Sequence, residues 1–406
     1  MRRIEIFLLH IVSLVAFGNL YYLSGFIGVS NNIILVLCLF ISFLYSFRHY
    51  NKFKSTFYNK IFRLFLFLSL VLIPVNIFSG YSFQVNHIVR ILWYVLLFNW
   101  IMNLYKDQWQ IQKYLKRIGF ILFACFILLS YIEYYSPELF KIVVYGELPE
   151  EANEVSRIAI TYRDSNTFTS ITCLFLYLLL RLDEKHNILL NLFLVIVSAV
   201  LVNLSGSRMG GLLLVIIFTW WSYKNFSLKM FLTIVIGSII SLSFYLNSAK
   251  DNSDNESASL ITRVFNTDSK QHMMAKASSD ERESSIYSAI EYGFSSNLLF
   301  PAGNFYFDNK WRNTDNHDYH FPHSSFVYLF CEYGIYCIFI FILFFRLFLL
   351  ARRNKELLLF ILTTIPLSLL PNIVYIFPIY LCAFIIEFKI LSLYENKNIL
   401  CDKSTI

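Results

Sequence analysis

The chain has 406 residues, of which 57% are hydrophobic, 18% are aromatic and only 15% are charged. Because a water-soluble domain carries about 25% charged residues, this composition excludes a soluble enzyme, a disordered chain and a nucleic-acid binder as first interpretations. The net charge of +7 identifies no partner by itself, so the distribution of the charges along the chain matters more than their sum.

Apolar runs recur from one end of the chain to the other. Each run is about 17 to 25 residues long, which an α-helix needs to cross a hydrocarbon core of about 30 Å. The sequence therefore predicts an all-α, polytopic integral membrane protein with about 12 transmembrane helices. Prolines interrupt the last two runs, which could also form one span and a re-entrant segment. The expected spans are 4–23, 32–47, 62–79, 87–104, 118–135, 166–181, 188–204, 208–223, 230–246, 324–345, 357–373 and 374–392.

The basic residues predict the orientation of these spans. If the N-terminus lies in the cytoplasm, the inner connections carry about 22 of the 34 Lys and Arg residues and the outer segments about 11. The positive-inside rule then places both termini in the cytoplasm. Residues 20–24 offer no small-residue cleavage site, so we expect the first span to be an uncleaved helix. The seven cysteines are scattered and indicate neither a disulfide framework nor a cysteine metal site.

Two polar segments remain on the outer side, a small loop and one large loop. A loop of about 76 residues is longer than a connection between helices requires, so we expect the function to reside on the outer face. The predicted parts of the chain are N-terminal helices over 1–135, the small loop over 136–165, central helices over 166–246, the large loop over 247–322, and C-terminal helices with a cytoplasmic tail over 323–406.

The small loop ends in two arginines at the head of the sixth span. Arg157 and Arg163 precede the run Asp164, Ser165 and Asn166. Any of these three side chains can cap the following helix, which is a purely structural role. The arginines are available as cations on the outer side.

Arg208 opens the eighth span after the turn Ser205, Gly206 and Ser207. A helix N-terminus presents backbone N–H groups and the positive end of the helix dipole, and an arginine adds a full charge. This combination favours a site for a phosphate-like anion at the outer surface. The alternative is that Arg208 only anchors the span among the lipid headgroups.

The large loop contains a further arginine on a predicted helix. Ser278 and Glu281 have the spacing of a capping box, and the run that follows places Arg282 on one stripe with Ile286 and Ile290. Arg282 would thus share a helix face with apolar residues. This arrangement is typical of an amphipathic helix that lies on the membrane with an arginine at its edge, which is a purely structural interpretation.

Three histidines, His317, His320 and His323, stand at the end of the large loop. Their spacing suggests a metal site, but Pro322 disfavours a regular helix through all three, and no cysteine or well-spaced carboxylate pair supports them. We therefore expect no metal. A single histidine that acts as a general base is the simpler interpretation.

The order of these features resembles the O-antigen polymerase and O-antigen ligase superfamily, over about residues 157 to 345. The resemblance implies an integral membrane glycosyltransferase of the bacterial inner membrane that acts on undecaprenyl-diphosphate-linked oligosaccharides at the periplasmic face. The motifs that carry it are Arg157 with Asp164-Ser165-Asn166, Ser205-Gly206-Ser207-Arg208, Arg282 ahead of Ile286 and Ile290, Pro301-Ala302-Gly303, and His323-Ser324 with Gly334.

The resemblance also implies roles for individual residues. Arg208 and Arg282 would bind the diphosphate of the donor, and His323 would deprotonate the acceptor hydroxyl. The further candidates for substrate binding are Arg157, Arg163, Ser207 and Ser324. No cofactor is implied, since two arginines can neutralise the charge of the leaving group. Membrane lipid and a chain-length regulator protein are the other expected partners.

Polymerase and ligase differ in the residues after the histidine. Ligases tend to have Gly-x-x-Gly there, whereas Cys337 follows Gly334 at the matching place in this chain. This favours a polymerase, with the ligase and a capsule or exopolysaccharide polymerase as alternatives. A transporter or lipid flippase would place charges or broken helices near mid-membrane, and a non-catalytic scaffold would tolerate loss of Arg208 and His323.

Overall fold

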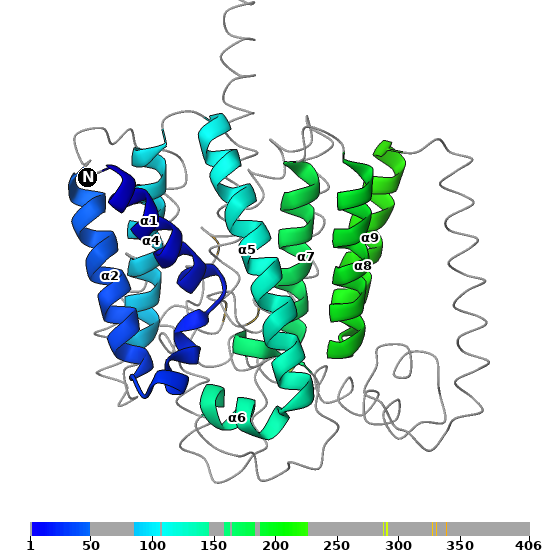
Figure 1. Ribbon diagram of the computed structural model, residues 1–406, viewed down its shortest axis with the longest axis horizontal. Helices are drawn as coiled ribbons and strands as arrows, with labels where there is room; N and C mark the ends of the chain where they lie inside the picture. Colours follow the sequence, from blue (N-terminus) through cyan, green and yellow to red (C-terminus); the bar gives the residue numbers. More distant parts are fainter. Residues whose placement is uncertain are drawn as a thin grey trace, which may run out of the picture. The chain divides into compact units, whose positions relative to one another are not determined.

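A computed structural model describes residues 2–48, 85–105, 108–145, 158–162, 165–182 and 187–225, together with Tyr287, Ile290, Val327, Phe330 and Ile338. Within these residues the protein consists of α-helices and short 3-10 segments and contains no strand (Figure 1). The all-α prediction is thus confirmed for the described part of the chain. The spans over 62–79, 230–246, 357–373 and 374–392 lie outside it, and of the large loop and the span over 324–345 it includes only the five single residues named above.

The helices occupy most of the predicted spans that fall within the described residues. The elements are α1 Arg2–Phe17, η1 Leu20–Ile27, α2 Asn31–Arg48, α4 Val85–Leu104, α5 Gln108–Tyr135, α6 Pro137–Tyr145, η3 Ile160–Tyr162, α7 Ser165–Arg181, α8 Ile188–Ser205 and α9 Arg208–Asn225.

Two described helices, Gln110–Tyr135 and Ile188–Ser205, are long and apolar enough to cross a membrane. A third span results if Arg3–Phe17 and Leu20–Phe26 count as one, although the two are bent by 90°. The predicted uninterrupted helix over 4–23 is therefore wrong in its second half. The helix breaks because Asn19 adopts a left-handed conformation with φ of 50°, which asparagine tolerates better than most residues.

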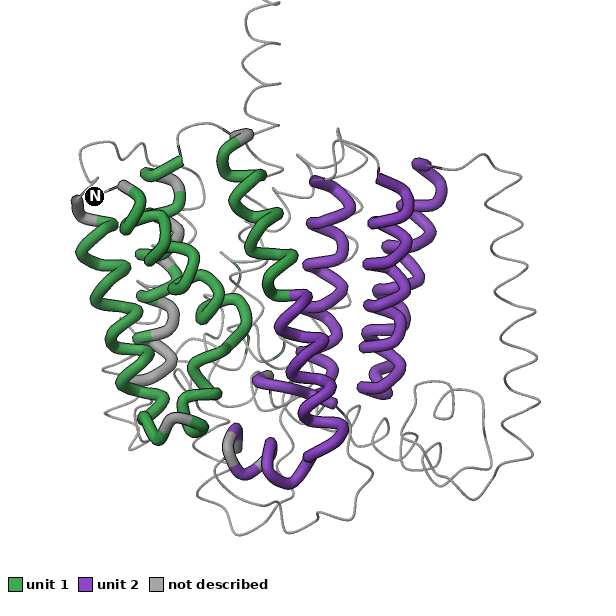
Figure 2. Tube along the Cα trace, viewed as in Figure 1, with its two compact units in different colours: residues 1–122, 282–406 green, residues 123–281 purple. Residues whose placement is uncertain are grey.

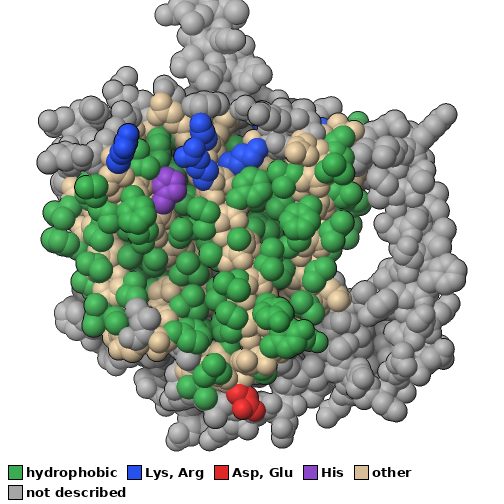
Figure 3. Space-filling view, in the orientation of Figure 1, with side chains coloured by type: hydrophobic (Ala, Val, Ile, Leu, Met, Phe, Trp, Pro, Cys, Tyr) green, Lys and Arg blue, Asp and Glu red, His purple; other side chains and the backbone are tan. Residues whose placement is uncertain are grey.

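The described helices expose apolar residues and bury polar ones. A water-soluble helix shows the opposite arrangement, so this is the distribution expected of helices whose solvent is lipid. On α8 the buried polar residues are Asn191, Ser198 and Ser205, and on α2 they are Ser42 and Ser46. The exposed apolar residues include Ile33, Val36, Leu37, Phe40 and Leu44 on α2, and Leu189, Leu192, Phe193, Ile196 and Val200 on α8. Figure 3 shows a face covered with hydrophobic side chains, with Lys and Arg at one edge.

The chain divides into two compact units, residues 1–122 with 282–406 (unit 1) and residues 123–281 (unit 2), and α5 contributes to both (Figure 2). In unit 1, the Tyr45 ring stacks on Trp100 with centroids 4.7 Å apart. The indole Nε1 of Trp100 donates a hydrogen bond of 3.2 Å to the buried carboxylate of Glu5. Aromatic packing and a satisfied buried acid thus hold α1, α2 and α4 together.

Candidate functional site

Of the residues predicted to form the site, the structure describes Ser207 and Arg208, both in unit 2. They lie where α8 ends and α9 begins. The other candidates, Arg157, Arg163, Arg282, His323 and Ser324, lie outside the described residues. Their roles therefore stay predictions.

Helices α7 and α9 run parallel, and their first turns lie side by side. The Ser207 hydroxyl donates a hydrogen bond of 2.8 Å to Asn166 Oδ1 at the start of α7. Further along both helices, the rings of Tyr177 and Trp220 pack with centroids 5.1 Å apart. Because these contacts occur in the same order along each helix, both N-termini lie at one end of unit 2.

The absence of a side chain at Gly210 permits this close approach. A Cβ atom built on Gly210 would lie 2.5 Å from the Cβ of Thr169, well inside van der Waals contact. Thr169 Oγ1 is held in place by a hydrogen bond of 2.9 Å to the Ser165 carbonyl. The Cys173 thiol donates to the Gly210 carbonyl across the same contact at 3.5 Å. Small residues at a helix interface allow such approaches in membranes.

The turn between α8 and α9 is fixed by its own hydrogen bonds. Gly206 adopts the left-handed conformation with φ of 61°, and its N–H donates to the Asn203 carbonyl at 3.1 Å. Ser207 then caps α9, because its hydroxyl oxygen accepts the Gly210 N–H at 3.1 Å. Since the Ser207 side chain is fully buried and bonded on both sides, it acts on the site by holding the turn.

Arg208 is the first residue of α9, as predicted, and its side chain is exposed. A cation at this position opposes the helix dipole, which favours cations in the last turn. Helices α7 and α9 both follow that rule with Arg181 and Lys224. Arg208 therefore does not stabilise α9 through the helix dipole. Its position at the N-terminus of the helix is suited to contact with an anion.

A buried carboxylate that the sequence analysis missed lies near the end of α5. Glu133 accepts hydrogen bonds from the backbone N–H groups of Ala159 at 3.1 Å and Ile160 at 2.7 Å. It thereby fixes the small-loop segment that packs against α7. An acidic residue inside a predicted span is a functional candidate by default, so the signal was present in the predicted span over 118–135.

The family comparison bears on this same turn. Residues 192–342 match the family model described as O-antigen ligase. This segment is similar to proteins of the O-antigen polymerase and ligase superfamily. The match confirms the resemblance seen in the sequence. It includes Arg208 and extends over Arg282 and His323. It covers less than half of the chain, and α5, η3 and α7 precede it. No curated protein and no solved structure matches the chain.

Proposed function

We propose that this protein is an O-antigen polymerase. It would join oligosaccharide repeat units linked to undecaprenyl diphosphate at the periplasmic face of the bacterial inner membrane. The observation that carries the proposal is the exposed Arg208 at the start of α9, inside the O-antigen ligase match and at the helix end where a cation does not serve helix stability.

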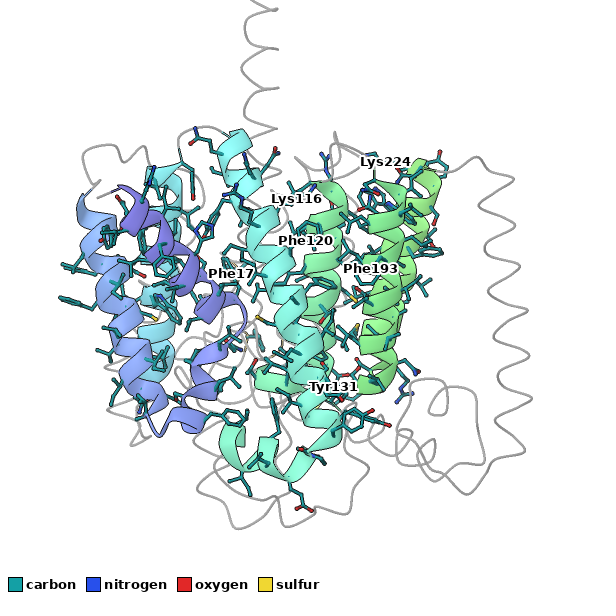
Figure 4. All side chains as sticks on the ribbon, viewed as in Figure 1. Phe17, Lys116, Phe120, Tyr131, Phe193 and Lys224 are labelled. Atoms are coloured by element: carbon teal, nitrogen blue, oxygen red, sulfur yellow. The ribbon has the colours of Figure 1, made fainter. Side chains whose placement is uncertain are left out.

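The charges on the helices support the orientation that this function requires. Helices α7 and α9 end in Arg181 and Lys224, and α5 has exposed cations near its start, Lys113 and Arg117. In Figure 4, Lys224 and Tyr131 lie at opposite ends of unit 2. By the positive-inside rule the cationic ends face the cytoplasm, and the N-terminus of α9 then faces the periplasm. The proposal includes about 12 spans with both termini in the cytoplasm.

Exposed tyrosines mark the membrane boundary at the C-terminal end of α5. Tyr131, Tyr134 and Tyr135 are all exposed at the C-terminal end of α5, and the rings of Tyr131 and Tyr135 pack with centroids 4.5 Å apart. Tyrosine is enriched where a helix leaves the hydrocarbon core and enters the headgroup layer. The Arg208 turn would thus lie near the outer headgroup layer, where a lipid-linked diphosphate resides.

The proposed chemistry is a displacement at the anomeric carbon of the donor glycan. The acceptor hydroxyl oxygen forms the new glycosidic bond while the bond to the diphosphate oxygen breaks, and undecaprenyl diphosphate leaves with the electron pair. His323 would take the proton of the acceptor hydroxyl. Arg208 and Arg282 would hold the diphosphate and neutralise the charge that develops on it. Arg157, Arg163 and Ser324 are further candidates for substrate contacts.

The electrostatic contribution of the arginines is large enough for this role. A guanidinium about 4 Å from a phosphate contributes on the order of 4 kcal/mol at an effective dielectric constant near 20, before desolvation is subtracted. Two such groups can supply the charge that a metal ion provides in other phosphate sites. We therefore propose a metal-independent reaction.

A ligase that transfers the finished glycan to the lipid A core is the second candidate. The description of the matching family model favours it, whereas Cys337 in place of the second glycine of Gly-x-x-Gly favours the polymerase. The lipopolysaccharide banding pattern of a deletion strain separates them. Loss of a polymerase leaves single repeat units on the lipopolysaccharide, and loss of a ligase leaves none.

Complementation of that strain tests the site. Arg208→Ala should restore no polymer although the protein is present in the membrane. Lys224→Ala is the matched control, because it removes an exposed cation from the other end of the same helix, and it should restore the wild-type ladder. A wild-type ladder from Arg208→Ala would contradict the proposed site.

A further inference from the structure

We propose that Glu133 is a positioning residue for the donor site. Its buried carboxylate would set the backbone of Ala159 and Ile160, and with it the head of α7 that holds the Arg208 turn. This inference rests on the proposed function, because the effect is expected on binding of the lipid-linked donor. It adds a residue from α5, outside the segment that matches the family model.

The carboxylate of Glu133 is costly to place where it is. The side chain is only 4% exposed, and an ionised group is buried without large loss only when it is well hydrogen-bonded. Two backbone N–H groups supply those bonds. An apolar residue at this position would leave both of these buried N–H groups without an acceptor. The carboxylate therefore holds one particular backbone conformation at Ala159 and Ile160.

That conformation is itself strained. Ile160 has φ of 44°, a left-handed value that a β-branched residue rarely adopts. It turns two successive N–H groups toward one acceptor, an arrangement that binds anions. Glycine would adopt this conformation without strain, yet the chain has a fully buried isoleucine here. Strain of this kind persists only where neighbouring contacts enforce it, and it gathers at functional sites.

The anchored segment connects to the Arg208 turn through α7. Ile158, Ala159, Ile160 and Thr161 are all buried, and η3 packs against α7. The first turn of α7 carries Asn166, which accepts the hydrogen bond of Ser207. A shift of the segment would thus displace the helix start that holds the cap of α9.

The sequence adds a second reason for fixing this segment. Arg157 directly precedes Ile158, and Arg163 directly follows Tyr162. The two arginines predicted to contact substrate are thus adjacent in sequence to the segment that Glu133 holds. Fixing the backbone between the two arginines would restrict their positions before an anion binds. Less conformational entropy is then lost on binding.

The test is Glu133→Gln, which keeps the size of the side chain but removes its charge and one acceptor oxygen. Donor is extracted from the deletion strain as undecaprenyl-diphosphate-linked repeat units, and polymer formation is measured with purified protein. We expect the KM for donor to rise about tenfold, because the two backbone N–H groups lose their charged acceptor, while kcat stays within about threefold. Glu138→Gln, an exposed glutamate on α6, is the matched control and should match the wild type.

If the glutamine variant is not recovered from the membrane, Glu133→Asp takes its place. It keeps the charge but is one methylene shorter, which withdraws the shared acceptor oxygen from both N–H groups, and it should raise the KM in the same way. A variant that folds and has a wild-type KM, or that loses kcat alone, would overturn the positioning role. A wild-type protein that forms no polymer from the extracted donor would instead overturn the proposed function, so the two failures are distinguishable.

Discussion

Gly210→Ala tests the parallel packing of α7 and α9 that places Arg208. The added Cβ would lie 2.5 Å from Thr169 Cβ and 2.6 Å from its Oγ1, whereas ordinary van der Waals contacts begin at 3.4 Å. No rotamer of Thr169 relieves the clash, because rotation about χ1 does not move the Cβ atom. Helices α7 and α9 must therefore separate by about 1 Å. Overpacking of this kind costs about 1–3 kcal/mol. A displacement of about 1 Å at a reacting site can cost about a hundredfold in rate.

The assay combines thermal unfolding of the purified protein with polymer formation. Gly210→Ala should lower the Tm and reduce polymer formation, and Leu212→Phe, which adds bulk at an exposed position of the same helix, should change neither. Adding Thr169→Gly to Gly210→Ala removes the clashing atoms, so the double variant should recover part of the polymer-forming activity. Its stability should stay about 1 kcal/mol below that of the wild type, because the new glycine lies within a helix. Wild-type Tm and activity in Gly210→Ala would refute the proposed packing.

Two further substitutions separate positioning from stability. Ser207→Ala removes both the cap of α9 and the bond to Asn166; it should cost about 1 kcal/mol in unfolding free energy and weaken polymer formation, and an unchanged polymer ladder would count against a role for this turn. Tyr114→Phe removes the buried hydrogen bond to Ser13 in unit 1. The variant should lose about 1 kcal/mol of unfolding free energy and have a lower Tm, and its KM for donor should not change. A raised KM in that variant would show that unit 1 also shapes the donor site.

The positions of the helices were predictable because lipid leaves a chain few alternatives. A backbone in the hydrocarbon core must satisfy its own hydrogen bonds, so an apolar run of sufficient length predicts a helix. The expected spans over 32–47 and 188–204 correspond to α2, Asn31–Arg48, and α8, Ile188–Ser205. Hydropathy does not report the direction of a helix axis, so it did not predict the bend at Asn19. A local signal was present, because glycine and asparagine, here Gly18 and Asn19, often end a helix.

The contacts that build the site could not be read from spacing along the chain. Asn166 and Ser207 are 41 residues apart, and Glu133 and Ile160 are 27 residues apart, so no helical periodicity relates them. The start of α9 at Arg208 was predictable, because a serine cap next to a glycine is a local signal. The partners of that cap depend on how α7 packs against α9, and only the structure supplies them.

The most direct test of the account is the binding of undecaprenyl diphosphate to the purified protein. The wild type and Lys224→Ala should bind it with the same Kd, and Arg208→Ala should bind it at least about tenfold more weakly, since a charge-assisted bond to phosphate is lost. Equal affinity in all three proteins would contradict the claim that Arg208 holds the lipid-linked diphosphate.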